Sequence, residues 1–181
     1  MKNKGLLFKA LASLLMIPCF VIPFLNIFMS HRVIGNTTSI IGEYGIFADY
    51  TALADGFSTL NGTLANIWMT LTSIFIVILA VLALAYIVML VLDLLKVKIK
   101  NIHMFSKILG IGILICSAVA LISAVIAVLT NTCSYTTLLT DTTTTLKLVF
   151  AVGAWLLIVP VIAGALAMIA PQTKTSKSKK K

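Results

Sequence analysis

Four long apolar runs constrain what this chain can fold into more than any other feature of it. They cover residues 10–30, 67–92, 108–129 and 148–170, and none of them contains Asp, Glu, Lys, Arg or His. A helix needs about 20 such residues to cross the roughly 30 Å hydrocarbon layer of a bilayer. The runs are too long and too evenly apolar for the strands of a membrane barrel, which alternate over about ten residues. Since lipid offers the backbone no hydrogen bonds, each run is expected to be a helix.

The predicted fold class is therefore all-α: a polytopic membrane protein with a four-helix transmembrane bundle, in a single membrane domain over residues 1–181. The composition agrees, because 60% of the residues are hydrophobic and only 10% are charged, whereas soluble domains are about a quarter charged. The formal net charge of +9 is spread over short clusters between the runs, which does not favour nucleic acid as a partner. The expected surroundings are the lipid bilayer.

The first run also fits the pattern of a secretory signal peptide, because Lys2, Lys4 and Lys9 precede it. It is longer than the apolar segment of such a peptide, and no small-x-small cleavage motif precedes the following loop. We expect a retained helix, kinked where Pro18 and Pro23 each remove a backbone donor. Cleavage as a signal peptide is the alternative.

The lysines predict the orientation of the chain. They gather before the first run, between the second and third runs, and in a basic tail over residues 171–181, whereas only Arg32 and Lys147 fall on the other side. The positive-inside rule then places both termini in the cytoplasm, and we expect insertion into the plasma membrane. Lysines near anionic headgroups contribute about 1 kcal/mol each, so the tail is expected to lie on the membrane surface. The tail lysines are Lys174, Lys177, Lys179, Lys180 and Lys181.

Two segments then lie outside, over residues 31–66 and 130–147. In the first, large apolar side chains recur at three- and four-residue steps, which is the period of one helix face. These residues are Phe47, Tyr50, Leu53, Phe57 and Leu60. They predict a short amphipathic helix on the outer membrane surface, and the same face is a candidate docking surface for a partner. The second segment is rich in threonine and is expected to be a solvated connector.

Two further patterns concern glycosylation motifs and cysteines. Asn36 and Asn61 begin glycosylation motifs, which are used only in an organism that glycosylates secreted proteins. Cys19 and Cys116 lie within apolar runs, whereas Cys133 lies just outside one and is either free or links two copies. Three cysteines do not indicate a disulfide framework.

Small residues recur every four positions in the third run, at Gly112, Cys116, Ala120 and Ala124. Such a stripe lets two helices approach closely. It is interpreted either as packing within the bundle or as a seam between copies of the chain.

Two polar residues near the ends of the runs are expected to have local partners. Asp93 is expected to pair with Lys96 or Lys98 at the cytoplasmic interface, and Asn26 to form a hydrogen bond to another helix.

The sequence contains no catalytic, cofactor-binding or metal-binding motif. Its layout resembles tetraspan membrane proteins, including claudin-like ones, although the first outer loop lacks the tryptophan and paired cysteines of the claudin-type loop. The expected role is non-enzymatic: a structural, assembly or accessory subunit that contacts another membrane protein or itself. The alternative is a small oligomeric channel or transporter, which the kinked helices and the hydroxyl residues within the runs would favour. Those residues are Thr70, Thr72, Ser73, Ser117 and Ser123.

Overall fold

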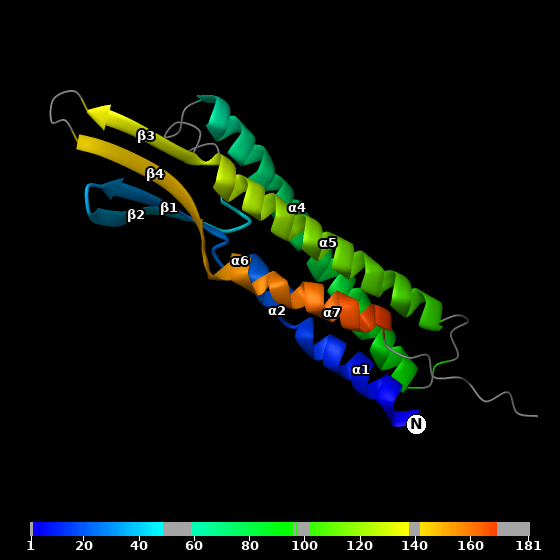
Figure 1. Ribbon diagram of the computed structural model, residues 1–181. Helices are drawn as coiled ribbons and strands as arrows, with labels where there is room; N and C mark the ends of the chain where they lie inside the picture. Colours follow the sequence, from blue (N-terminus) through cyan, green and yellow to red (C-terminus); the bar gives the residue numbers. More distant parts are fainter. Residues whose placement is uncertain (1, 49–58, 96, 98–101, 138–141, 170–181) are drawn as a thin grey trace, which may run out of the picture.

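The computed structural model describes residues 2–48, 59–95, 97, 102–137 and 142–169. The helices form an elongated bundle, and a small antiparallel sheet extends from one end of it (Figure 1). We call this the sheet end, and the opposite end, where α1 begins, the N-terminal end. In chain order the elements are α1 (Lys2–Leu15), α2 (Pro18–Val21), the 3-10 helix η1 (Ile22–Phe24), β1 (Phe28–Ile34), β2 (Thr37–Tyr44), α4 (Thr59–Leu94), α5 (Ile102–Thr130), β3 (Thr132–Thr137), β4 (Thr142–Phe150), α6 (Val152–Leu156) and α7 (Ile158–Ile169).

Four helical stretches are long and apolar enough to cross a membrane, which confirms the prediction of four such helices. They are Leu7–Phe24, Asn66–Leu94, Met104–Thr130 and Val152–Ile169. Their outward surfaces are apolar as well as their buried ones. On α4 the exposed side chains include Ile74, Val77, Val81, Leu84 and Val88. A continuous apolar surface of this kind is typical of helices that face lipid.

The first and fourth of these stretches are interrupted, whereas the second and third are continuous. α1 ends at Leu15, and α2 begins at Pro18. The second interruption follows α6, because Leu157 separates α6 from α7. Pro160 lies in the first turn of α7, where a backbone N–H would have no helical partner. Proline therefore lies close to each interruption.

The third and fourth stretches approach each other closely where both carry small residues. A Cβ atom added to Gly164 of α7 would lie 2.7 Å from the backbone nitrogen of Leu114 in α5. One added to Gly110 of α5 would lie 3.0 Å from the Cβ of Ala167. Only residues without a side chain allow this spacing. The core of the bundle is filled by larger side chains, among them Met16, Ile76, Leu79, Tyr86, Ile113 and Leu157.

The sheet has four antiparallel strands in the order β2-β1-β4-β3. Its two central strands continue from the first stretch and into the fourth, since β1 follows η1 and β4 precedes α6. They pair from Phe28↔Phe150 to Ile34↔Thr144. The β1–β2 hairpin turns at Gly35, whose φ of 56° is in the left-handed region that favours glycine. The sheet thus joins the first and last helical stretches directly.

The prediction of an all-α fold is confirmed only in part: the four membrane-length helices are present, but the outer segments contribute this sheet. The first run was expected to remain helical to residue 30, but Phe28–Ile34 is β1; the fourth was expected to begin at residue 148, but Thr142–Phe150 is β4. A short apolar run does not distinguish a helix from a buried strand. Threonine and other β-branched residues favour the strand, and these are concentrated in β4.

The predicted amphipathic helix in the first outer segment also needs correction. Phe47 lies in a turn after β2 and is 80% exposed. Leu60 belongs to the first turn of α4 rather than to a separate helix. The intervening Tyr50, Leu53 and Phe57 lie outside the described residues. The three- and four-residue spacing therefore does not correspond to one helix spanning Phe47 to Leu60.

Candidate functional site

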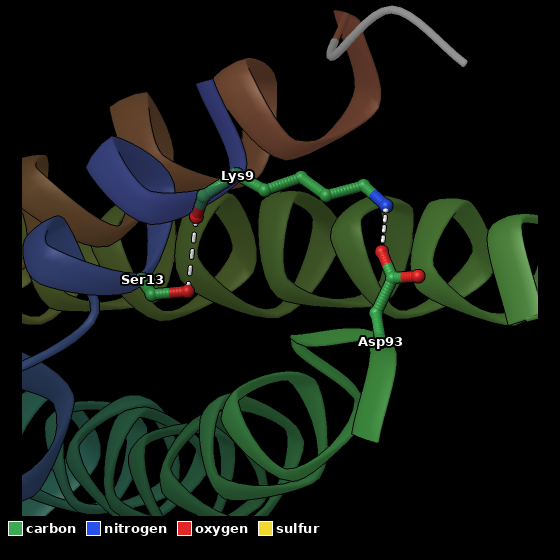
Figure 2. A network of polar contacts seen from close by, with 3 residues as sticks. All are labelled: Lys9, Ser13 and Asp93. Atoms are coloured by element: carbon green, nitrogen blue, oxygen red, sulfur yellow. Dashed lines mark hydrogen bonds and ion pairs between the residues drawn. The ribbon is translucent and has the colours of Figure 1, made fainter. Parts of the chain in front are cut away.

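At the N-terminal end of the bundle, an ion pair links α1 to α4 (Figure 2). The Nζ of Lys9 lies 2.6 Å from Oδ2 of Asp93, and the two side chains are 10% and 26% exposed. The hydroxyl of Ser13 donates a hydrogen bond of 3.0 Å to the backbone carbonyl of Lys9, one turn earlier in α1. The pair therefore fastens two helices that are far apart in the sequence.

This contact changes the expected partner of Asp93. Pairing with Lys96 or Lys98 was predicted, and both of these lysines lie outside the described residues. Among the residues that the structure describes, Asp93 pairs with Lys9, because the end of α4 lies beside α1. Sequence proximity favoured the nearest lysine, and only the packing of the helices brings Lys9 within reach.

Inside the bundle, one pair of hydroxyl groups connects α4 to α5. The oxygens of Thr72 and Ser123 lie 2.8 Å apart. Each hydroxyl also contacts a carbonyl oxygen of its own helix, that of Trp68 for Thr72 and that of Ala120 for Ser123. Such contacts satisfy hydroxyl groups locally, and they stabilise helix packing without requiring a bound solute.

The hydroxyl groups of Ser73 and Ser117 donate to the carbonyl oxygens of Met69 and Ile113 in their own helices. Thr70 is on the exposed side of α4. The hydroxyl residues of the apolar runs are therefore distributed over different surfaces.

The stripe predicted in the third run lies in α5. Ala120 and Ala124 are fully buried within the single chain, and Gly112 and Cys116 are half-buried. A Cβ added to Gly112 would lie 3.3 Å from Leu82 of α4. The structure thus places Gly112 against α4 and encloses the two alanines inside the bundle.

At the sheet end, backbone hydrogen bonds continue into the residues that connect the strands to the helices. The N–H of Ala151 donates to the carbonyl of Ile27 at 2.9 Å, and the N–H of Leu148 to that of Asn131 at 3.0 Å. The predicted bond of Asn26 to another helix is wrong, because its Nδ2 donates to Oε2 of Glu43 in β2. The polar groups of this junction are used to hold the sheet in place.

Charged residues of the sheet are unevenly distributed between its strands. His31 and Arg32 lie on β1 and Lys147 lies on β4, which are the two central strands. The edge strands, β2 and β3, contain no basic residue, and β2 contains a single acid, Glu43. The sequence analysis did not predict this distribution of charge, because it assigned no strands to the two outer segments. The available signal was the run of β-branched residues in both outer segments.

An exposed aromatic residue lies close to the junction of sheet and bundle. Trp155 of α6 is 62% exposed, and its ring packs edge-on against Phe150 with 5.7 Å between ring centroids. Tryptophan at this position is typical of the interface between lipid and water. Trp155 thus lies near the start of the apolar stretch Val152–Ile169, close to the end of β4.

The basic tail, Lys174 to Lys181, lies outside the described residues, so its predicted contact with the membrane surface stays a prediction. In the part of the chain that the structure describes, no three His, Cys, Asp or Glu side chains are grouped so that they could hold a metal ion.

Comparison of the chain with protein-family models, with curated proteins and with solved structures gave no match. The fold alone defines the class: a mostly helical protein with four helices able to span a membrane and a small sheet at one end of the bundle.

Proposed function

We propose that this chain is a non-enzymatic integral membrane protein that acts as a structural, assembly or accessory subunit of a membrane complex. In this proposal both termini are in the cytoplasm of the cell, the sheet lies outside the plasma membrane, and a partner binds the sheet. The lysine clusters support this orientation, since in the sequence they adjoin those ends of the helical stretches that are not connected to a strand.

The observation that carries the proposal is the exposed apolar surface of the sheet. Ile40 and Ile41 of the edge strand β2 are 58% and 48% exposed. These residues lie away from the bundle, where they would meet water rather than lipid. Apolar surface grouped at such a position is typical of a protein-binding site.

The contacts within the bundle favour a structural role over a solute pathway. Thr72 and Ser123 bond to each other, and Ser73 and Ser117 bond to their own helices. Hydroxyl groups engaged in this way contribute to packing. A small oligomeric channel or transporter is therefore the second hypothesis. The experiment described next distinguishes the two hypotheses.

The test is isolation of the chain at its native level in mild detergent, followed by native mass spectrometry. A different protein present at fixed stoichiometry supports the accessory-subunit proposal. A uniform self-assembly that passes a solute in liposomes would favour the channel. A lone monomer that retains its fold and binds nothing contradicts the proposal.

Orientation is tested separately with the native thiols. A membrane-impermeant maleimide applied to intact cells should label Cys133, and the label should be absent from the Cys133→Ser variant. In the Cys133→Ser background, Ser176→Cys should react only after the cells are permeabilised. The reverse pattern would place the sheet in the cytoplasm.

A further inference from the structure

The sheet has two edges whose outward sides pair with no other described strand. They belong to β2, with eight residues, and to β3, with six. Along β2, the five residues from Thr37 to Ile41 are all exposed. An edge of this length presents a row of backbone N–H and C=O groups that another strand can bind.

The sequence of these edges lacks the usual protection against pairing. Lone edges are commonly blocked by lysine or proline, yet neither residue occurs in Thr37–Tyr44 or Thr132–Thr137. The basic residues of the sheet lie instead on its central strands, as described above. This is the reverse of the placement expected for a sheet that remains alone.

A register shift interrupts β2 between Ile40 and Gly42, opposite Ser30 and His31 of β1. Bulges also discourage edge pairing. This one leaves the outer half of the strand regular, because Thr37 to Ile40 pair in sequence with Ile34 to His31. The part of β2 farthest from the bundle is therefore suited to accept another strand.

The directions of the two edge strands determine what can pair with them. β3 leaves the bundle directly after α5, whereas β2 follows the β1 hairpin back toward the bundle (Figure 1). In two copies inserted the same way into one membrane, β3 of one copy and β2 of the next would therefore run antiparallel. Two β2 strands would run parallel, and parallel pairing is somewhat less stable per residue.

We propose that the partner of the sheet is a second copy of this chain, and that the outward edge of β2 in one copy pairs with the outward edge of β3 in the next. This inference rests on the proposed function and names its partner. The contact is head-to-tail, so the copies form a row or, if the sheet twist closes it, a ring. A shared bilayer favours this contact because it already orients the copies alike.

Disulfide trapping tests the pairing of unlike edges. With Cys19 and Cys116 replaced by alanine, the native Cys133 remains on β3, and a second cysteine is placed on β2 at Thr37, Thr38, Ser39 or Ile40 in turn. At a matching register, mild oxidation should link each copy to two neighbours and give a ladder of dimers, trimers and larger species. Disulfides form only when the two Cβ atoms lie about 4 Å apart, so the register is reported as well.

The control for trapping is Ile34→Cys, which is also exposed but lies on a central strand. It should give no ladder with Cys133. If the β2 cysteine forms dimers after Cys133→Ser, then like edges pair and the proposal is wrong. Absence of a ladder at all four β2 positions also overturns it.

A charge substitution provides an independent test. Ile40→Lys places a lysine on the β2 edge and should lower the oligomeric fraction in native mass spectra about tenfold. Ile34→Lys adds the same charge to a central strand and should leave that fraction nearly unchanged. Equal effects of the two variants would show that edge pairing is not the contact.

The two proposals fail in different ways. If the wild-type chain binds a different protein at fixed stoichiometry but none of the β2 cysteine variants gives a ladder, the accessory-subunit proposal stands and self-pairing is rejected. If it neither binds another protein nor self-associates, both are rejected.

Discussion

The sheet end and the N-terminal end of the bundle are held together by different kinds of contact. At the sheet end, β1 and β4 pair over seven successive positions, and this pairing joins the first helical stretch to the fourth. At the N-terminal end, the described contact between charged groups is the single Lys9–Asp93 pair, which joins α1 to α4. One end is joined by backbone pairing, whereas at the other a pair of charged side chains adds to the packing of the helices.

This difference determines which substitutions each end tolerates. A ladder of backbone hydrogen bonds persists through most changes of side chain, because each bond contributes only about 1 kcal/mol and the donors and acceptors are unchanged. A mostly buried ion pair is more sensitive, since removal of either charge loses the attraction between the two groups. The contact of α1 with α4 should therefore weaken through single polar substitutions, and the sheet end mainly through changes to the backbone itself.

The largest expected effect is that of Val33→Pro in the central strand β1, which removes a backbone donor and constrains φ. We expect a loss of about 3 kcal/mol in the free energy of unfolding, measured by titration with denaturing detergent in mixed micelles. Trypsin cleavage after the exposed Lys147 of the paired strand β4 should rise at the same time. Val33→Thr keeps the β-branched shape and should change neither measurement appreciably. An unaltered cleavage rate in the proline variant would contradict the role assigned to the β1–β4 ladder.

Asp93→Asn should have the next largest effect, a loss of about 2 kcal/mol, because it leaves the largely buried Lys9 without its acidic partner. The measurement is a double-mutant cycle with Lys9→Gln. The double variant should lose less than the sum of the two single variants. Strict additivity would show that the pair does not stabilise the N-terminal end.

Gly164→Ala tests the close contact of α5 and α7. The added Cβ would lie 2.7 Å from the nitrogen of Leu114, and this backbone atom can move only with its helix. We expect a loss of about 2 kcal/mol in the same titration. The matched control is Gly112→Ala, whose added Cβ would meet the mobile end of the Leu82 side chain. That variant should change stability by less than about 1 kcal/mol, and similar losses in both variants would refute the distinction.

The smallest effect is expected for Ser123→Ala, which removes the hydroxyl contact with Thr72 in the middle of the bundle. Hydrogen bonds between membrane helices contribute about 0.6 kcal/mol on average. We expect a loss of that size, measured against Ser117→Ala, because Ser117 bonds only within its own helix. A larger loss for Ser117→Ala would show that the α4–α5 contact does not depend on this pair.

The same contrast explains which parts of the fold could be predicted from the sequence. The second run was predicted as residues 67–92, and α4 contains all of it, because hydropathy over that length permits only a helix in lipid. The strands at Phe28 and Leu148 could not be distinguished from the adjoining apolar helices, because buried strands and apolar helices favour the same residues. Local apolarity determines that a residue is buried, but not the element that buries it.

Contacts between distant segments were harder to predict than the elements themselves. Lys9 was assigned to the charged segment before the first run, and its pairing with Asp93 depends on how α1 packs along α4. The edges of β2 and β3 follow from a strand order that brings the first and last strands together. Neither arrangement has a signature in residue spacing.

The pairing of β1 with β4 also has a consequence for how the protein is made. Synthesis proceeds from the N-terminus, so the β1–β2 hairpin is complete before α5, β3 and β4 have been translated. During that interval the side of β1 that will face β4 has no partner from its own chain. In the proposed orientation, the sheet can be completed only when the last strand has been delivered across the membrane. A ribosome that stalls between α5 and β4 therefore leaves a chain with its long helices present and the centre of its sheet open, which is a feature that quality-control proteases can recognise.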